Sequence, residues 1–574
     1  MSETTTMNFM GNTNFIPSNL TQLKLLVTCW FLGEPTYYIP SGSVNKKPLH
    51  KSNNTISNNN HLHLIQSNTT NTMEIFINVV NKALSENFEE VLKLAIEARN
   101  DYNMRSGPCA VLYYAIKHPN RQDFNKLNPL KLREYAKQIL KIPTDAWMLF
   151  ELWQQDNKPI LSNATCVTGS DVSVNKKCLK KKLPTIFKKI IADHIESMSK
   201  YQMKKYLNKS HIIDLVRISH ANPTVNPLIS EIIKTGDLIV EETEQTWELL
   251  RSQQKGWKEI ITTLNKVPHM ALLRNLVGII KDTNDEDYLN NIVFPMLKAG
   301  VKNGKQFPFR YLTCLEEVIK LEDNYKSCKV SCEKALNDCV EISMENFPIL
   351  EGNTICLCDN SGSAWGTFPS QYGKQTVAKI ANLSGIMTAK NCTGKGYVGV
   401  FGDTLKLMEI DKTKKILDQT HDINIIGSTV GASTENGIWI FFNEAFEEAL
   451  NLEKEGTIIS RESLSKWFDN IFIMSDMQCA SGGLYGKHPN EYKDFQVNGN
   501  YIDGLKLIEN YRKTINPKVN VYCVQVAGYN NTMIPEVLYR THILSGWTSM
   551  ETTFADKMNK LMDDMDNGIM SVTI

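Results

Sequence analysis

Residues 354–363, TICLCDNSGS, decide the fold of the C-terminal part of this chain. An apolar run of strand length passes directly into a D-x-S-x-S sequence that begins at Asp359. Three similar runs follow, GYVGVF, IFIMSD and VNVYCVQVAG, and helical segments alternate with them. Alternating apolar strands and helices indicate βα units around a largely parallel sheet. We therefore expect an α/β domain of Rossmann-like type over residues 348–574.

Polar residues gather where these predicted strands end. Asp359, Ser361 and Ser363 follow the first strand, and Asp476 ends the strand IFIMSD. Ligands bind at the carboxyl edge of such sheets, and carboxylate and hydroxyl oxygens together suit Mg²⁺. The simpler alternative makes Asp359 a helix N-cap and Asp476 a turn former.

The Gly-rich loop GSTVGASTENG at 427–437, which precedes the helical segment IWIFFNEAFEEAL, adds a third loop to this pattern. The three loops together resemble the metal-ion-dependent adhesion site of von Willebrand A-type (vWA) domains. That resemblance implies a divalent metal site, with Mg²⁺ as the expected ion and with the ligands Asp359, Ser361, Ser363, Thr434 and Asp476. Thr429 stays an alternative to Thr434, although the G-x-x-T spacing before the helix favours Thr434. The site type leaves one coordination position open for a carboxylate or phosphate oxygen of a partner.

Residues 73–347 carry apolar side chains at helical spacing almost throughout. Breakers such as SGP at 106–108 and HPN at 118–120 interrupt this pattern repeatedly, as expected of antiparallel helix pairs stacked into a solenoid. Residues 1–19 and 51–72 are polar and rich in Asn and Thr. We expect a mobile N-terminal segment over residues 1–72, with an apolar piece beginning at Leu20 that docks on the body.

Three segments of the helical part resemble the Ro (TROVE-domain) family: GEPTYYIP at 33–40, KSHIIDLVRISHANP at 209–223 and WKEIITTLNKVPHMALLRNL at 257–276. With the vWA pattern, the resemblance spans residues 20 to 550 or so. It implies a TROVE domain over residues 20–347, built as an α-helical solenoid of HEAT-like repeats that closes into a toroid, followed by the vWA domain.

The resemblance also implies a function. Ro proteins bind small noncoding RNAs of the Y type and the ends of misfolded structured RNAs, as ribonucleoproteins in RNA quality control. They act in the cytoplasm, with the nucleus as a second location, and they are not enzymes. The chain departs from the family in its Asn-rich insert at 51–72 and in residues 479–500, so partners at those surfaces stay open.

The basic charge of the chain is local. Lys and Arg number 63 against 62 Asp and Glu, whereas residues 175–209 hold eleven lysines against two acids. Such a patch can bind phosphates with salt-dependent affinity, although most charge runs are solvated helix faces. Because the patch precedes the segment that resembles the family's RNA-contacting motif, we expect RNA contacts at Lys200, Lys204, Lys205, Arg217 and His220. Arg217 can instead pair with Asp214, three residues before it.

The remaining features exclude several classes of protein. None of the 13 cysteines forms a C-x-x-C pair, which indicates reduced thiols inside an intracellular protein. No apolar run approaches the roughly 20 residues of a membrane span, and no P-loop, H-E-x-x-H or G-x-S-x-G motif indicates catalysis. The alternative function is a protein-interaction scaffold whose vWA metal captures acidic partners. A pull-down that depends on divalent ions and ignores RNase would favour that alternative.

Overall fold

The computed structural model describes most of the chain in two compact units. One unit comprises Ile77–Thr246, and the other comprises Met1–Phe76 together with Trp247–Ile574. The described residues are 4–7, 13–29, 72–101, 104–156, 183–207, 211–238, 246–306, 308–366, 375–431, 437–442, 468–477, 484, 488–497, 501–526, 532–535, 538–545 and 551–567. Within them, no helix is long and apolar enough to cross a membrane.

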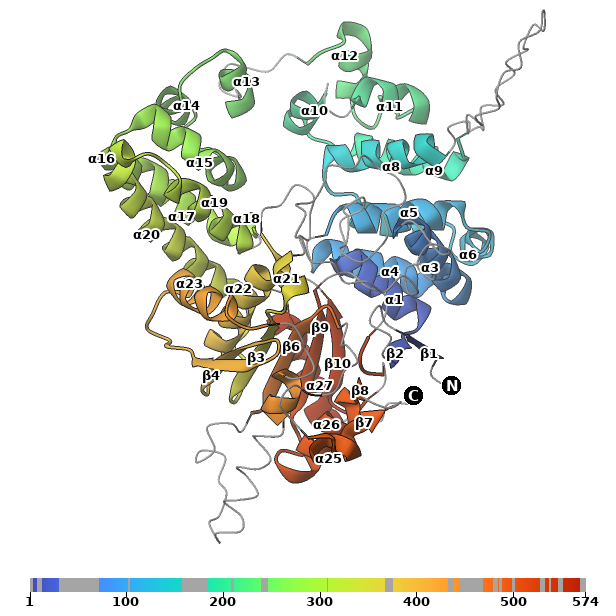
Figure 1. Ribbon diagram of the computed structural model, residues 1–574. Helices are drawn as coiled ribbons and strands as arrows, with labels where there is room; N and C mark the ends of the chain where they lie inside the picture. The colour runs from blue at the N-terminus through green and yellow to red at the C-terminus, as the bar shows by residue number, and fades with distance from the viewer. Residues whose placement is uncertain are drawn as a thin grey trace, which may run out of the picture. The chain divides into compact units, whose positions relative to one another are not determined.

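The unit formed by residues 77–246 is helical (Figure 1). Its helices are α3 (Thr72–Glu86, which begins just before the unit), α4 (Phe88–Asn100), α5 (Ser106–Lys117), α6 (Arg121–Leu127), α7 (Lys131–Ile139), α8 (Pro143–Asp156), α9 (Thr185–Glu196), α10 (Lys200–Tyr206), α11 (Ile212–Ser219) and α12 (Leu228–Thr235). Helix α4 packs on α5 and α7, α5 packs on α8, and α9 packs on α11. These helices thus bury their apolar stripes against one another, which confirms the predicted helical repeats.

A buried carboxylate ties three of these helices, α4, α5 and α8, together. Asp145, at the start of α8, is fully buried and accepts hydrogen bonds from the backbone N–H groups of Lys141 (2.9 Å) and Ile142 (3.1 Å). It also pairs with Arg99 of α4 (3.2 Å) and with Arg105 before α5 (2.8 Å). A carboxylate removed from water is tolerated because its oxygens are fully used in this way.

The second unit continues with helices and then forms the sheet. Its helices before the sheet are α13 (Trp247–Ser252), α14 (Trp257–Leu264), α15 (His269–Thr283), α16 (Glu286–Tyr288), α17 (Phe294–Ala299), α18 (Val301–Gly304), α19 (Phe309–Ile319) and α20 (Lys326–Ser343), with short η segments at Leu289–Val293, Asp323–Tyr325 and Met344–Asn346. The buried His269 joins three of them, because its imidazole bonds the Leu297 carbonyl of α17 (2.9 Å) and the Tyr311 hydroxyl of α19 (2.8 Å).

The sheet has six strands in the order β10-β9-β6-β3-β4-β5. The strands are β3 (Thr354–Asp359), β4 (Gly396–Phe401), β5 (Leu405–Glu409), β6 (Asn470–Ser475), β9 (Asn520–Gln525) and β10 (Thr541–Ser545). All neighbours are parallel except β4 and β5, which are antiparallel. The α/β architecture expected from the sequence is therefore confirmed. The fold places the carboxyl ends of β3 and β6 side by side.

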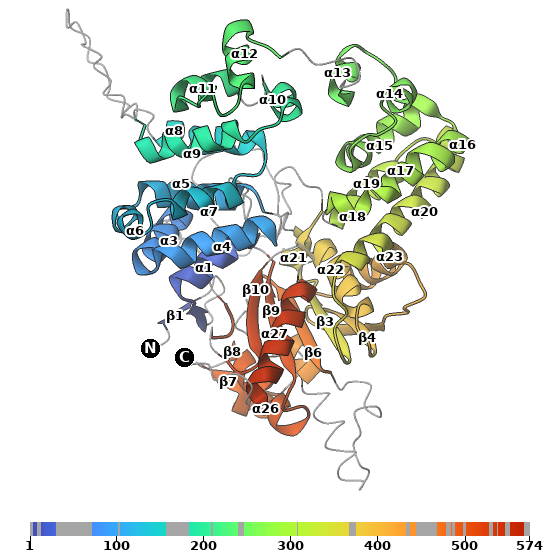
Figure 2. The ribbon, with the colours of Figure 1, turned by 180° about the vertical axis from the view of Figure 1, so that it is seen from behind.

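Side chains of β3 alternate between two apolar cores on opposite faces of the sheet. Cys356 and Cys358 belong to the core that contains α22 (Val377–Lys390), α23 (Ile416–Gly427) and part of α27 (Glu551–Asp566). Ile355 and Leu357 belong to the other core, with residues 438–442 and α26 (Gly504–Thr514). Seen from behind, α27 crosses in front of the strands (Figure 2). The nine cysteines whose side chains the structure describes are all buried and unpaired, as predicted.

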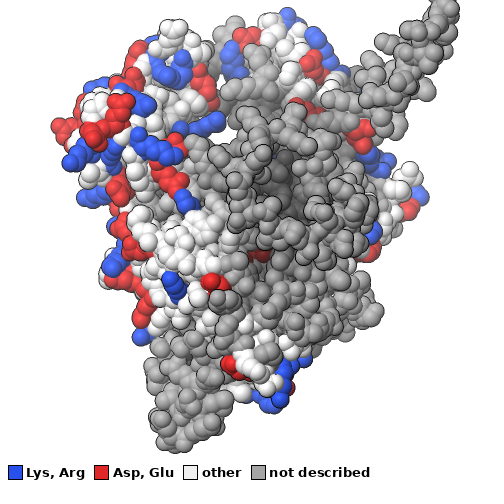
Figure 3. All heavy atoms as spheres, viewed as in Figure 1, with Lys and Arg blue, Asp and Glu red and all other residues white. Residues whose placement is uncertain are grey.

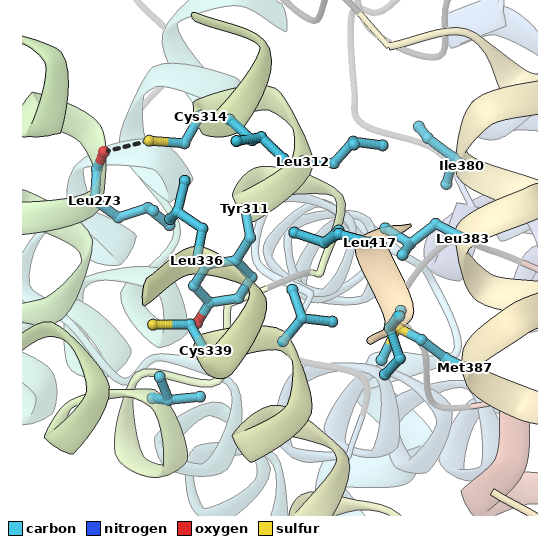
Figure 4. Close-up of a cluster of buried hydrophobic side chains, with 14 of the residues drawn as sticks. Leu273, Tyr311, Leu312, Cys314, Leu336, Cys339, Ile380, Leu383, Met387 and Leu417 are labelled. Carbon is cyan, nitrogen blue, oxygen red and sulfur yellow. Dashed lines mark hydrogen bonds between the residues drawn. The ribbon is translucent and has the colours of Figure 1, made fainter. Parts of the chain in front are cut away.

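One core runs without interruption from the helices before the sheet into the sheet's own helices. Leu312 of α19 and Leu336 of α20 share it with Leu383 of α22 and Leu417 of α23 (Figure 4). The predicted boundary at residue 347 therefore falls inside a single compact unit, because the structure divides after Thr246 instead. The predicted limits of the TROVE domain (20–347) and of the vWA domain (348–574) stay predictions.

The N-terminal residues hold more structure than their composition predicts. Strands β1 (Thr4–Met7) and β2 (Thr13–Ile16) form an antiparallel pair, although a mobile tail was expected here. The β-branched threonines of this segment favour an extended backbone. Helix α1 (Asn19–Cys29) buries Leu23, Leu26 and Val27 and contacts β10. Residues 30–71, which include GEPTYYIP and nearly all of the Asn-rich insert, lie outside the described residues. The remaining short elements are α25 (Pro489–Tyr492), η5 (Lys493–Phe495), β7 (Gln496–Val497) and β8 (Tyr501–Ile502).

Replacing Asp145 with Ala should lower the free energy of unfolding by about 3–5 kcal/mol, because Arg99 and two backbone N–H groups lose a buried partner. Urea denaturation followed by circular dichroism measures this change. The matched control is Asp123→Ala, which removes a carboxylate that is 78% exposed and paired with Lys126. The control should leave the midpoint unchanged. Equal midpoints for the two variants would show that the Asp145 network does not hold α4, α5 and α8 together.

Candidate metal cluster and candidate nucleic-acid interface

Strand β3 ends in a carboxylate that is completely buried. Asp359 has no exposed surface; its Oδ1 accepts a hydrogen bond from the Ser361 backbone N–H (2.9 Å) and its Oδ2 accepts one from the Ser475 hydroxyl (2.8 Å). Burial raises the pKa of Asp359, and the bonds from the two serines oppose that rise only in part. Within the described residues its hydrogen-bond partners are all neutral.

The other predicted ligands of the first and third loops lie beside Asp359. The Ser361 and Ser363 hydroxyls are 3.1 Å apart, and the Ser363 hydroxyl donates to Oδ2 of Asp476 at 3.4 Å. They meet because β3 and β6 are parallel neighbours in register, so their carboxyl ends coincide. Four of the five predicted metal-site residues are thus brought together. We call Asp359, Ser361, Ser363 and Asp476 the strand-end cluster.

Two features around the strand-end cluster escaped the sequence analysis. The Ser475 hydroxyl donates a hydrogen bond to Asp359. The sequence pattern that could have indicated this residue is a polar side chain at the end of the apolar strand IFIMS, directly before Asp476. Asn360 exchanges two hydrogen bonds with Asn382 of α22, at 2.8 and 3.0 Å. That reciprocal amide pair fixes the loop backbone between Asp359 and Ser361. Pairing between residues so distant in sequence left no local signal.

The second loop is only partly described. Thr434 lies outside the described residues. Thr429, the alternative, is exposed; its hydroxyl bonds the Ile426 carbonyl (2.6 Å) and accepts from the Lys406 ammonium (2.6 Å). No described contact joins Thr429 to the strand-end cluster. Nearby, the Gly431 backbone N–H donates to Oδ1 of Asp403 at 2.6 Å.

The donor set of the strand-end cluster fits a hard divalent cation. It offers two carboxylates and two hydroxyls, and it lacks the soft thiolate and imidazole ligands that favour zinc or copper. In the described part of the chain, no group of three or more His, Cys, Asp or Glu side chains is placed to hold a metal ion. Two ionised carboxylates would balance the charge of a bound dication, and the two hydroxyls would add no further negative charge to it.

The candidate RNA-binding residues lie on two consecutive short helices. Helix α10 begins with a capping box between Ser199 and Gln202, and Lys200 is exposed in its first turn. Lys204 forms an ion pair with Asp237 at 2.6 Å, which the sequence analysis missed. Lys205 is helical, but its side chain lies outside the described residues, as do the lysines between 176 and 182.

Helix α11 carries the other two candidates. Arg217 is exposed and has no ion pair in the described structure, whereas its alternative partner Asp214 lies 3.7 Å from the imidazole of His211. His220 ends α11 in the left-handed conformation (φ 57°), and its exposed imidazole has no hydrogen-bond partner within the described residues. His211 begins α11, also left-handed, and its ring stacks on Trp147 with the centroids 4.1 Å apart.

The charges of the described surface are mixed. On the face shown in Figure 3, Lys and Arg side chains lie among Asp and Glu side chains. This agrees with the near balance of 63 basic and 62 acidic residues. The described part of this face therefore carries no uniformly basic surface.

Comparison with known proteins finds one family that matches a segment of the helical part. Residues 239–346, which cover α13 to α20, match the TROVE domain. The chain thus contains a segment that is similar to the TROVE domain. The matched segment contains WKEIITTLNKVPHMALLRNL, whereas α10, α11 and the strand-end cluster lie outside it.

The fold of the chain also matches a solved structure. The crystal structure of the Deinococcus radiodurans Ro (RSR) protein aligns with 94% of this chain and 100% of its own, with a TM-score of 0.50 and 11% sequence identity. Such a likeness shows a shared arrangement of helical repeats and an α/β domain. No curated protein matches the chain in sequence.

Proposed function

We propose that this protein is an RNA-binding ribonucleoprotein component of the Ro type. The observation that carries the proposal is the TROVE match over residues 239–346, in a chain whose fold follows a Ro protein along nearly its whole length. The expected ligands are small noncoding RNAs and the ends of misfolded structured RNAs, in RNA quality control in the cytoplasm and the nucleus. The activity is binding, without catalysis.

The exposed side chains of α10 and α11 support an RNA contact there. Lys200 and Arg217 each present a positive charge that no described carboxylate neutralises, so binding of phosphates would not first have to break an ion pair. His220 holds an exposed ring at the end of α11, where an unpaired base can stack on it. Lys204 differs, because its charge is already shared with Asp237.

We further propose that the strand-end cluster, with Thr434 from the second loop, binds Mg²⁺. The buried, neutral surroundings of Asp359 support this, because a dication would offset the cost of an ionised carboxylate without solvent. The bound ion would supply a positive charge at the sheet edge that can hold a phosphate or carboxylate oxygen of a partner. Asp359 and Asp476 would provide the negative charge, and Ser361 and Ser363 neutral oxygens.

Replacing Lys200 and Arg217 together with Ala should weaken binding of a small structured RNA and reduce the slope of log K against log salt by about 2, as expected for two phosphate contacts. Filter binding across a salt series measures the slope. The matched control replaces Lys126 and Lys137, two exposed lysines of α6 and α7 in the same unit, and should keep the slope. Absence of RNA binding by the unaltered protein at low salt would refute the proposed function.

His220→Ala should act differently, because it removes a ring and not a fixed charge. We expect affinity to fall roughly 5- to 100-fold for RNAs that place an unpaired base there, with the salt slope unchanged. A fully base-paired duplex of equal length serves as the comparison ligand and should bind the variant as before. If His220→Ala leaves every RNA unaffected while circular dichroism shows a folded protein, the assignment of His220 is wrong.

Asp359→Asn and Asp476→Asn should each abolish binding of Mg²⁺ or Mn²⁺ in isothermal titration calorimetry, because each removes charge while keeping the side-chain shape. The unaltered protein should gain about 2.7 kcal/mol of stability at a cation concentration a hundredfold above Kd, and the variants should not. Asp411→Asn, in an exposed turn of the same α/β part, is the control. Undiminished binding in both cluster variants would overturn the metal assignment.

A further inference from the structure

Helices α19, α20, α21 (Gly362–Gly366), α22 and α23 surround a surface hollow of about 510 Å³. We call it the α19–α23 hollow. It lies entirely within the unit that contains residues 247–574. Neither the strand-end cluster nor the candidate RNA-binding residues line it. Its volume is in the range of cavities that hold a small ligand or the anchoring side chains of a peptide.

The wall of the hollow is largely apolar. Its apolar lining is formed by Leu312, Leu315, Ile319, Trp365, Leu417 and Ile425. Two of these are unusually exposed for their type, Ile319 at 57% and Ile425 at 55%. Because they stand on α19 and α23, they present apolar surface from two different helices around one concavity. Exposure of such an apolar surface to water is unfavourable, and an apolar side chain bound there would displace the water.

The rim of the hollow is acidic. Glu333 of α20 and Asp422 of α23 are exposed and form no hydrogen bond or ion pair with any described residue. Asp418, one turn before Asp422, accepts a single bond from Asn337 (3.1 Å). The remaining acid, Glu316, is already satisfied by Lys379 (2.7 Å) and by Gln375 (2.6 Å). Three carboxylates thus lack a cation, and two of them are one helical turn apart, where like charges repel.

Trp365 adds a hydrogen-bond donor to the lining. Its indole Nε1 is buried and has no hydrogen-bond partner in the described structure. A buried donor without an acceptor is costly, and a ligand that brings a carbonyl oxygen would satisfy it. Trp365 is held in place by its own backbone N–H, which donates to the Ser361 carbonyl at 3.2 Å.

These three features together select one kind of partner. We infer that the α19–α23 hollow docks a segment of another protein that carries apolar side chains next to Lys or Arg. Such a segment supplies apolar surface for Ile319 and Ile425, positive charge for Glu333 and Asp422, and backbone carbonyls for Trp365. Phosphates of RNA would meet uncompensated carboxylates here, and a polyamine would bring neither a branched apolar side chain nor an acceptor. The hollow is therefore an interaction surface separate from the proposed RNA-binding one.

The test uses the full-length protein without RNA and three fluorescein-labelled 16-residue helical peptides, read by fluorescence anisotropy. One peptide has a Leu face and a Lys face, the second carries Glu in place of Lys, and the third carries Ser in place of Leu. The Leu/Lys peptide should bind, and the other two should bind at least roughly tenfold more weakly, as loss of paired charge or of apolar burial requires.

Variants then locate the binding. Glu333→Lys with Asp422→Lys should raise the Kd of the Leu/Lys peptide on the order of tenfold, and Ile319→Asn with Ile425→Asn should do likewise. The matched control reverses two exposed acids elsewhere in the same unit, Asp287→Lys with Glu509→Lys, and should change Kd less than twofold. All six positions are exposed, so folding is preserved, and circular dichroism verifies it.

Some outcomes would overturn the inference. Equal weakening by the control pair would mean that the peptide follows net charge alone, and equal binding of the Glu-substituted peptide would exclude an acidic docking site. Displacement of the Leu/Lys peptide by RNA in the Lys200 and Arg217 variant would assign the hollow to nucleic acid. Because the peptide assay contains no RNA in its first stage, it can succeed even if the protein binds no RNA, and the two proposals are tested separately.

Discussion

Burial of one helix, α22, on nearly every side is the constraint on which the C-terminal unit depends. Every residue of α22 from Val377 to Ala389 is buried except Lys379. A helix that is buried all round must be covered on all faces. The sheet covers one side, and α19, α20 and α23 share its apolar core on the others. Gly385 allows this fit, because a Cβ there would lie only 2.7 Å from the Sγ atom of Cys358 in β3.

The same helix also fixes polar groups that the proposed sites use. Asn382, fully buried in α22, holds Asn360 in the loop after β3 and bonds Asn424 of α23 at 2.8 Å. Asn424 in turn lines the α19–α23 hollow. Buried amides such as these cost free energy unless they are fully bonded, so their pairing specifies one position for the loop and for α23. Packing of α22 thus sets the positions of both the strand-end cluster and the hollow.

Much of this arrangement could be predicted from the sequence, because periodicity and strand-end chemistry are local signals. The change from helical spacing to short apolar strands at about residue 348 identified the sheet, and the D-x-S-x-S sequence after β3 identified Asp359, Ser361 and Ser363. What escaped prediction depends on pairs distant in the chain. The ion pair of Lys204 with Asp237 and the amide pair of Asn360 with Asn382 leave no local pattern, and the hollow needs five helices to be placed at once.

The uninterrupted core between the TROVE segment and the sheet has a consequence for truncation of the chain. Residues 239–346 match a family domain, yet Leu312 and Leu336 within them pack on Leu383 and Leu417 beyond them. Cutting the chain after residue 346 would leave those leucines in water, at a cost of about 1.5–3 kcal/mol for each fully buried side chain that loses its cover.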